Sequence, residues 1–252
     1  MDELGDFSKQ ADAYARSRPG YPEVVLDHLV RVAGVESGDE VVDIGAGTGI
    51  LTKQLVDRGF TVTAVEPNAS MRELGERYVS NATWIDGCFE DIRLDAGCSR
   101  WVTVAQALHW AKLSEALPEL ARVLCDGGCM SVMWNVRQDG KDDVVDWTHA
   151  LIDRHVKGFQ ERYKAMGNGY ECDVIASGVF ELIDRKCYEY SIKMSKNRYL
   201  DLWRSHNHLR VRAGEEALAA IMKELEVHMV VGNVEEVGVP YITETWTYRK
   251  IV

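Results

Sequence analysis

The chain has 252 residues, of which 46% are hydrophobic and 27% are charged, and its formal net charge is −11. This length and balance are typical of a soluble globular protein with one large α/β domain or two small ones. An acidic chain is a poor partner for nucleic acids, because phosphate binding requires clustered Lys and Arg side chains.

The N-terminus and the cysteines indicate the cellular compartment in which we expect the protein. No apolar run approaches the roughly 20 residues that span a bilayer, and the acidic start "MDELGDFSKQ" is not a secretory signal. The 6 cysteines form no Cys-x-x-Cys pair and show no ligand spacing with histidine. We therefore expect a cytoplasmic protein with reduced cysteines, no bound metal and no membrane partner.

Short apolar runs alternate with amphipathic stretches from residue 40 onward. The pattern predicts strands at 40–44, 61–66, 83–87, 101–108 and 129–134, with helices at 48–59, 68–80 and 114–128. In the last of these helices we expect Pro118 in or near the first turn, where its missing N–H costs little. This alternation indicates a mostly parallel, doubly wound sheet.

The last third of the chain is less regular. Alternating residues predict strands at 187–195 and 240–250, with Pro240 at a strand start or a sheet edge, and helical spacing predicts a helix at 212–229. The segment 136–186 contains helical stretches. It is either a lid or substrate-binding insertion or a plain pair of surface helices, and the sequence leaves both open.

The stretch "VVDIGAGTGIL" at 41–51 places Gly45, Gly47 and Gly49 between a predicted strand and a predicted helix. Glycine there permits a sharp turn and lets a ligand approach main-chain N–H groups, which makes a turn without a ligand the weaker interpretation. A dinucleotide fingerprint needs a third glycine where this chain has Ile50, and a P-loop needs a following Gly-Lys-Ser/Thr. The spacing is therefore typical of neither.

Two acidic residues narrow the choice of ligand. Asp43 stands two positions before the first glycine, where it would repel a pyrophosphate but suits a ligand with a cationic end, such as S-adenosylmethionine. Glu66 ends the next predicted strand about twenty residues later and can accept hydrogen bonds from ribose hydroxyl groups. We therefore favour S-adenosylmethionine over NAD.

With these residues in place, the chain resembles the class I S-adenosylmethionine-dependent methyltransferases (methyltransferase type 11) from about residue 7 to residue 135. The motifs that carry the resemblance are "VVDIGAGTG" (41–49), "VEPNASM" (65–71), "DGCFEDIRL" (86–94), "VAQALHW" (104–110) and "LARVLCDGG" (120–128). Together with "QALHW", the N-terminal "FSKQADAYARSRPGYP" (7–22) is similar to the small-molecule subgroup that includes trans-aconitate methyltransferase-like enzymes.

The resemblance implies an architecture and a set of cofactor contacts. The architecture is a single domain over 1–252 with a seven-stranded, Rossmann-like sheet and an antiparallel last strand. A helical cap lies at 1–35, and the helical insertion at 136–186 separates strands five and six. The residues implied to contact the cofactor, with Cys88 standing where the family often has Asp, are Asp43, Gly45, Ala46, Gly47, Gly49, Glu66, Pro67, Met71, Cys88, Phe89, Glu90 and Gln106. Tyr14 and Arg18 lie four positions apart, so on a helix they share a face that we expect to close over the cofactor, and a plain surface helix is the alternative.

Methyl transfer from a sulfonium is a direct displacement, so the protein mainly aligns the acceptor, the methyl group and the sulfur. A general base is needed only when the acceptor must lose a proton. His109 is our candidate base, with a plain backbone hydrogen bond as the alternative. The candidate acceptor-binding residues, for which core packing is the alternative, are Tyr21, His109, Trp110, Trp134, Trp203 and His206.

The sequence thus predicts a methyltransferase that acts on N or O of a small metabolite. A heteroaromatic or carboxylate-bearing acceptor and a step in natural-product biosynthesis are the working hypotheses. The alternatives are an NAD-dependent oxidoreductase and a non-catalytic protein that binds the same cofactor, and a macromolecular acceptor is less favoured. We expect a monomer or a homodimer.

Overall fold

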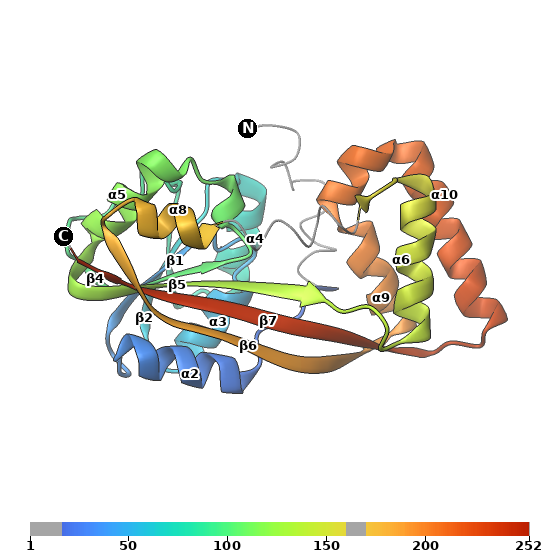
Figure 1. Cartoon of the computed structure of the whole chain (residues 1–252), viewed down its shortest axis with the longest axis horizontal. Helices are drawn as coiled ribbons and strands as arrows, with labels where there is room; N and C mark the ends of the chain where they lie inside the picture. The colour runs from blue at the N-terminus through green and yellow to red at the C-terminus, as the bar shows by residue number, and fades with distance from the viewer. Residues whose placement is uncertain (1–16, 160–169, 252) are drawn as a thin grey trace. The chain divides into compact units, whose positions relative to one another are not determined.

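The computed structural model describes residues 17–159 and 170–251. Their contacts divide them into two compact units, and the long strands β5, β6 and β7 contribute residues to both (Figure 1). The sheet unit comprises residues 20–135, 170–188 and 243–251, and the helical unit comprises 17–19, 136–159 and 189–242.

Seven strands form one sheet in the order β3-β2-β1-β4-β5-β7-β6. Their bounds are β1 (Glu40–Ile44), β2 (Thr61–Val65), β3 (Thr83–Ile85), β4 (Ser99–Ala105), β5 (Leu124–Arg137), β6 (Phe180–Ser195) and β7 (Glu236–Lys250). Strands β1 to β5 pair in parallel. The chain runs outward from β1 to β2 and β3, then returns to β4 on the other side of β1. The order therefore reverses between β1 and β4, which is where open α/β sheets bind ligands.

Side-chain hydrogen bonds fix the direction of β7. The Ser131 hydroxyl lies 3.0 Å from the Thr247 hydroxyl, and the Thr243 hydroxyl donates to the Asn135 amide oxygen at 2.6 Å. Residue numbers therefore rise along β5 where they fall along the paired β7. The last strand is antiparallel, and the predicted doubly wound, seven-stranded sheet is confirmed.

The helices of the sheet unit cover both faces of the sheet. They are α2 (Glu23–Ala33), α3 (Ile50–Asp57), α4 (Ala69–Tyr78), α5 (Leu113–Val123) and α8 (Tyr170–Ala176). Figure 1 shows α2 on one side of the sheet and α5 and α8 on the other. Apolar residues of α2 and α3 share a buried core with the sheet that includes Leu29, Leu55 and Trp101. Of the expected N-terminal cap at 1–35, residues 17–35 are described and contain α2, and residues 1–16 lie outside the described residues.

The predicted helix at 114–128 is wrong from residue 124 onward. Helix α5 ends at Val123, and β5 begins at Leu124. Pro118 lies inside the helix and not in its first turn. A proline there removes the hydrogen bond to the carbonyl of Ser114, but both residues are exposed, so water can satisfy that carbonyl.

Strands β6 and β7 also differ from the predictions. Strand β6 begins at Phe180 and not at 187, so the expected insertion at 136–186 ends sooner. Pro240 lies within β7, an interior strand, and not at a strand start or a sheet edge. Its carbonyl accepts the N–H of Gln138 at 2.9 Å, so the proline still takes part in the sheet.

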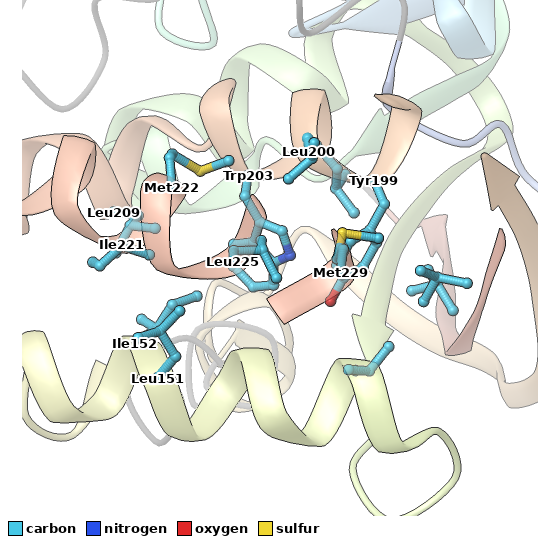
Figure 2. Close-up of a cluster of buried hydrophobic side chains, with 14 of the residues drawn as sticks. Leu151, Ile152, Tyr199, Leu200, Trp203, Leu209, Ile221, Met222, Leu225 and Met229 are labelled. Carbon is cyan, nitrogen blue, oxygen red and sulfur yellow. The ribbon is translucent and has the colours of Figure 1, made fainter. Parts of the chain in front are cut away.

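The helical unit contains α6 (Asp143–His155), α9 (Lys196–Arg204) and α10 (Asn207–Val231). Helix α10 begins earlier than the predicted residue 212, and it kinks at Gly214, where φ is 77° and ψ is 165°. Figure 2 shows the buried cluster between these helices, with Trp203 and Tyr199 beside Leu225 and Met229. No helix in the described part of the chain combines the length and the apolar character needed to cross a bilayer.

Candidate active site

The candidate site lies in the sheet unit, at the carboxyl ends of β1 and β4. The glycine-rich turn joins β1 to α3, and the segment from Gln106 to Lys112 joins β4 to α5 through the short 3-10 helix η2 (Leu108–Trp110). Because β1 and β4 are parallel neighbours, both connections leave the same edge of the sheet.

Close packing explains the first glycine of the turn. Gly45 has φ of 68°, and a Cβ atom at this position would lie 2.6 Å from the Cβ of Ala107. The backbone N–H groups of Gly45 and Ala46 donate to the carbonyl of Val65, at 2.9 and 3.2 Å. Glycine is therefore required both for its left-handed backbone and for the close approach of the β4 connection.

Asp43 is buried beneath this turn, with 1% of its surface exposed. Its two carboxylate oxygens accept hydrogen bonds from the hydroxyls of Thr52, at 2.7 Å, and Thr103, at 3.0 Å. Burial raises the pKa of Asp43 to about 6, the negative charge of Glu66 adds to the rise, and the two hydroxyls oppose it. This arrangement ties β1, β4 and α3 together and leaves a contact between Asp43 and a ligand as a prediction.

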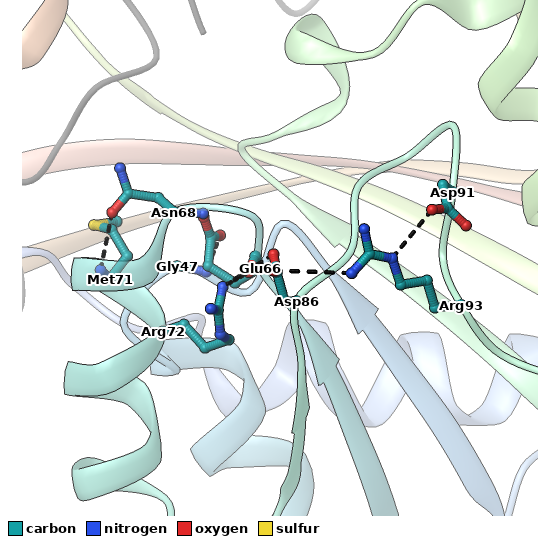
Figure 3. Close-up of polar contacts among 8 residues, drawn as sticks. All are labelled: Gly47, Glu66, Asn68, Met71, Arg72, Asp86, Asp91 and Arg93. Atoms are coloured by element: carbon teal, nitrogen blue, oxygen red, sulfur yellow. Dashed lines mark hydrogen bonds and ion pairs between the residues drawn. The ribbon is translucent and has the colours of Figure 1, made fainter.

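Glu66 follows β2 and holds the turn from the side (Figure 3). Its carboxylate accepts the N–H of Gly47 at 2.8 Å and the N–H of Asn68 at 2.9 Å. Burial raises the pKa of Glu66, whereas these two N–H groups and Arg72 lower it. The carboxylate is thus fixed at the sheet edge, and its contact with a ribose stays a prediction.

Helix α4 begins beside Glu66. Asn68 caps it, since its side chain accepts the N–H of Met71 at 3.1 Å. A Cβ atom at Gly47 would meet only the methyl end of Met71, at 3.2 Å. Pro67 is exposed, and whether Pro67 and Met71 pack near an adenine ring stays a prediction.

The segment after β3 approaches the same turn. The ring of Phe89 is buried, and it lies 3.6 Å from a Cβ atom built on Gly45. Glu90 accepts the backbone N–H of Lys112 at 2.7 Å and so joins this segment to the β4 connection. Cys88 is partly buried and pairs through its backbone with Asp91. Whether these residues flank an adenine ring stays a prediction.

Gln106 begins the β4 connection with an unusual backbone. Its φ is 59°, which costs free energy for a residue with a side chain. Its N–H donates to the carbonyl of Met133 at 2.9 Å, and its side-chain amide donates to the carbonyl of Asn135 at 3.1 Å. These bonds to β5 hold the connection in place, next to Ala107 and the glycine turn.

Aromatic side chains gather immediately beyond this point. The ring of His109 lies 4.3 Å from that of Trp110 and 5.2 Å from that of Trp134. Trp134 also stacks on Tyr170 of α8, with 6.3 Å between centroids and 11° between planes. Trp134 is buried, and its indole N–H has no hydrogen-bond partner among the described residues. The site thus offers an aromatic wall with one buried donor.

The other candidate residues lie elsewhere. Tyr14 is outside the described residues, and the Tyr21 ring is buried in the core of the sheet unit beneath α2 and α3. Arg18, Trp203 and His206 belong to the helical unit, where Trp203 and His206 are buried. Their contacts with a cofactor or an acceptor stay predictions.

The residues at the turn fit S-adenosylmethionine. Thr48, within the turn, is 2% exposed, and its hydroxyl has no hydrogen-bond partner in the described part of the chain. Glycine at 47 leaves the main chain open to a ligand, and two buried carboxylates stand nearby. A cationic ligand offsets the cost of burying Asp43 and Glu66, whereas a pyrophosphate would increase it.

Sequence reasoning missed three participants, namely Thr48, Ala107 and Tyr170. Thr48 lies inside the quoted motif, and its small polar side chain between two glycines was a usable signal. Ala107 and Tyr170 carry no such signal, because their roles come from contacts with residues distant in the sequence. Within the described residues, no group of three or more His, Cys, Asp or Glu side chains could hold a metal ion.

Comparison with known proteins agrees with this geometry. The family model described as "Methyltransferase domain" matches residues 42–132. The chain is 30% identical to the uncharacterized methyltransferase Rv3342 of Mycobacterium tuberculosis over 240 residues. The matched region covers 94% of this chain and 92% of that protein.

Two solved structures share the fold. A chain assigned as a type II methyltransferase from Anaeromyxobacter dehalogenans gives a TM-score of 0.63 at 21% identity, over 92% of this chain and 97% of that chain. The second is phosphoethanolamine N-methyltransferase 2 of Haemonchus contortus, in complex with phosphomonomethylethanolamine and S-adenosylhomocysteine. It gives a TM-score of 0.57 at 13% identity, over 99% of this chain and 60% of that chain.

Proposed function

Because the chain belongs to the class I S-adenosylmethionine-dependent methyltransferases, we propose that it methylates N or O of a small metabolite held against the aromatic wall of His109, Trp110, Trp134 and Tyr170. The observation that carries this proposal is the position of that wall. His109 and Trp110 follow Gln106 in the β4 connection, at the sheet edge that the glycine turn and Glu66 also occupy. Trp134 of β5 lies beside His109 and stacks on Tyr170 of α8.

The glycine turn and its two acids hold the cofactor. Glu66 accepts hydrogen bonds from the ribose hydroxyls, because each of its oxygens keeps a lone pair beyond the one used by a backbone N–H. The negative charge of Asp43, which is buried beneath the turn, favours a positively charged ligand. When bound, S-adenosylmethionine supplies a methyl group that is already activated by its sulfonium.

The aromatic wall positions the acceptor. A planar acceptor would stack on Trp134, and the indole N–H would donate to one of its polar atoms. The His109 imidazole would accept the proton that an N–H or O–H acceptor loses, if that acceptor carries one. The N-methyltransferase from Haemonchus contortus supports a nitrogen acceptor within this fold. A tailoring step in biosynthesis is the setting that we propose.

Calorimetry and a transfer assay test the proposal. We expect S-adenosylhomocysteine to bind and NAD not to bind. With labelled S-adenosylmethionine, a panel of small amines, phenols and carboxylic acids should yield a labelled product. Tight binding of NAD would overturn the cofactor assignment. Binding of S-adenosylhomocysteine without transfer to any member of the panel would favour the non-catalytic alternative.

A further inference from the structure

Helix α8 carries Tyr170, the partner of Trp134 in the aromatic wall, and is too short to hold its own position. It has 7 residues, and an isolated helix of fewer than about 12 residues is marginal in water. Within the described range 170–176, Val174 is the one buried residue. Contacts with the sheet must therefore keep α8 in place, and with it the Tyr170 ring.

Glu171 supplies a polar contact between α8 and the sheet. It precedes Val174 by three positions, so the two side chains lie on the same face of the helix. Its Oε2 atom accepts the indole N–H of Trp246, on β7, at 2.9 Å, and lies 3.3 Å from Nη1 of Arg185, on β6. The Arg185 guanidinium carbon in turn lies 5.4 Å from the centroid of the Trp246 ring. Glu171 thus joins α8 to both β6 and β7.

The bond to Trp246 is the more important of these two contacts. The Arg185 side chain is 52% exposed, and an ion pair at such exposure contributes little to stability. Trp246 is 4% exposed, so its N–H would lose its described acceptor in a buried position if the carboxylate were removed. A hydrogen bond to a carboxylate is strong, and a buried donor is costly to leave unpaired.

Trp246 and Trp134 point to the same face of the sheet. The side chains that hydrogen-bond β5 to β7 share one face, and they are Ser131, Asn135, Thr243 and Thr247. Each tryptophan stands one position before one of these residues, so it points to the opposite face, because successive side chains of a strand alternate. Tyr170 stacks on Trp134, and the next residue, Glu171, bonds Trp246. Two consecutive residues of α8 therefore contact two tryptophans of one face.

We propose that Glu171 is a positioning residue for the methyl acceptor, which holds the Tyr170 ring on Trp134 through its bond to Trp246. This inference rests on the proposed function for the role of the wall, because it takes the acceptor to lie against Trp134 and Tyr170. Without the carboxylate, α8 loses its bond to β7 and Tyr170 leaves the Trp134 ring. The acceptor then loses one aromatic surface, whereas the cofactor contacts on the glycine turn stay intact.

Fluorine NMR of the full chain, labelled with 5-fluorotryptophan, follows the Trp134 ring directly. The chain has 7 tryptophans, and the Trp134 resonance is the one that is absent from Trp134→Phe. Tyr170→Leu removes the stacked ring and gives the shift that its loss produces. We expect Glu171→Ala to move the Trp134 resonance in the same direction. The helix propensity of alanine is at least that of glutamate, so the substitution does not weaken α8 by itself.

Two further variants accompany Glu171→Ala. Trp246→Phe removes the indole N–H and keeps an aromatic ring, so it should also move the Trp134 resonance, and it keeps the test valid if Glu171→Ala fails to fold. Glu181→Ala is the matched control, because it removes a carboxylate of β6 that pairs with Arg249 of β7 at 3.8 Å. This control should leave the Trp134 resonance in place.

Kinetics test the consequence for the acceptor. With the acceptor found in the panel, Glu171→Ala should raise the acceptor KM about two- to tenfold with little change in kcat, because a stacking surface is lost equally in the ground state and in the transition state. The Kd for S-adenosylhomocysteine should stay the same. Glu181→Ala should leave all three constants unchanged. A parental acceptor KM in Glu171→Ala would overturn the positioning role.

The spectra can also contradict the inference. A Trp134 resonance that moves in Tyr170→Leu but stays in place in Glu171→Ala would overturn it, as would a Trp134 resonance that does not respond to Tyr170→Leu. Failure of the proposed function has a different signature, because S-adenosylhomocysteine would then not bind or no methyl group would be transferred. The fluorine spectra would still report whether Glu171 holds Tyr170.

Discussion

The carboxylate of Glu66 accepts the backbone N–H of Gly47 at 2.8 Å, and this bond ties the glycine-rich turn to the end of β2. The acid that we assign to the cofactor ribose therefore also shapes the turn. Its second oxygen accepts the N–H of Asn68, at the start of α4. One buried side chain thus connects the first two strand-to-helix connections of the sheet.

Removing the charge of Glu66 should weaken cofactor binding. In Glu66→Gln an NH2 group replaces one carboxylate oxygen, and this group cannot accept a hydrogen bond. Either a backbone N–H or a ribose hydroxyl therefore loses its acceptor. We expect the Kd for S-adenosylhomocysteine, measured by calorimetry, to rise about tenfold or more. Glu76→Gln, at an exposed position of α4, is the control and should bind normally. An unchanged Kd in Glu66→Gln would remove the ribose assignment.

Asp43 should make stability depend on pH. Its pKa is raised by burial from 3.8 to about 6, so the folded state holds its proton more tightly than the unfolded state does. The cost of burying the charge is absent below pH 4 and fully present above pH 6, and the difference corresponds to roughly 3 kcal/mol.

Asp43→Asn removes this cost. The free energy of unfolding of the variant, relative to that of the parent, should therefore be higher at pH 8 than at pH 4, by up to about 3 kcal/mol. Urea-induced unfolding of both proteins at the two pH values measures this. A difference that does not change with pH would show that Asp43 titrates normally in the folded protein.

Two variants should separate the effect of close packing at Gly45 on stability from the effect of its left-handed backbone. Gly45 and Gly34 have nearly equal φ, 68° and 67°, but a Cβ atom at Gly34 meets nothing within 4 Å. Gly34→Ala should cost about 1 kcal/mol from the left-handed backbone alone. Gly45→Ala should cost roughly 1–3 kcal/mol more, because the new methyl group collides with Ala107. Urea midpoints compare the two, and equal losses would contradict the packing argument.

His109 should affect turnover and not cofactor binding. If it removes a proton from the acceptor, His109→Gln should lower kcat about 10²- to 10⁴-fold with the acceptor found in the panel. The affinity for S-adenosylhomocysteine should stay the same. His155→Gln in α6, where the histidine pairs with Glu224, is the control. A normal kcat in His109→Gln would leave the imidazole as part of the aromatic wall and not as a base.

Local signals predicted the sheet and its ligand edge well. The sequence "EVVDI" is buried at four of its five positions, as a central parallel strand must be, and α4 lies within the predicted helix at 68–80. The helix end at Val123 and the start of β6 at Phe180 were predicted less well. Pairing with β4 and β7 extends both β5 and β6 beyond their periodic cores, and a pairing partner cannot be read from a local pattern.

The sequence by itself determined the cofactor side of this protein. Asp43 lies near the end of β1, and Gly45 and Glu66 begin the connections that follow β1 and β2. Parallel strands bring their carboxyl ends and these connections to one edge of the sheet. Only the tertiary structure brought together the aromatic wall that we propose for the acceptor. Trp134 lies beside His109 and stacks on Tyr170, across many intervening residues. The burial that gives those side chains their chemistry exists only once distant segments have packed together.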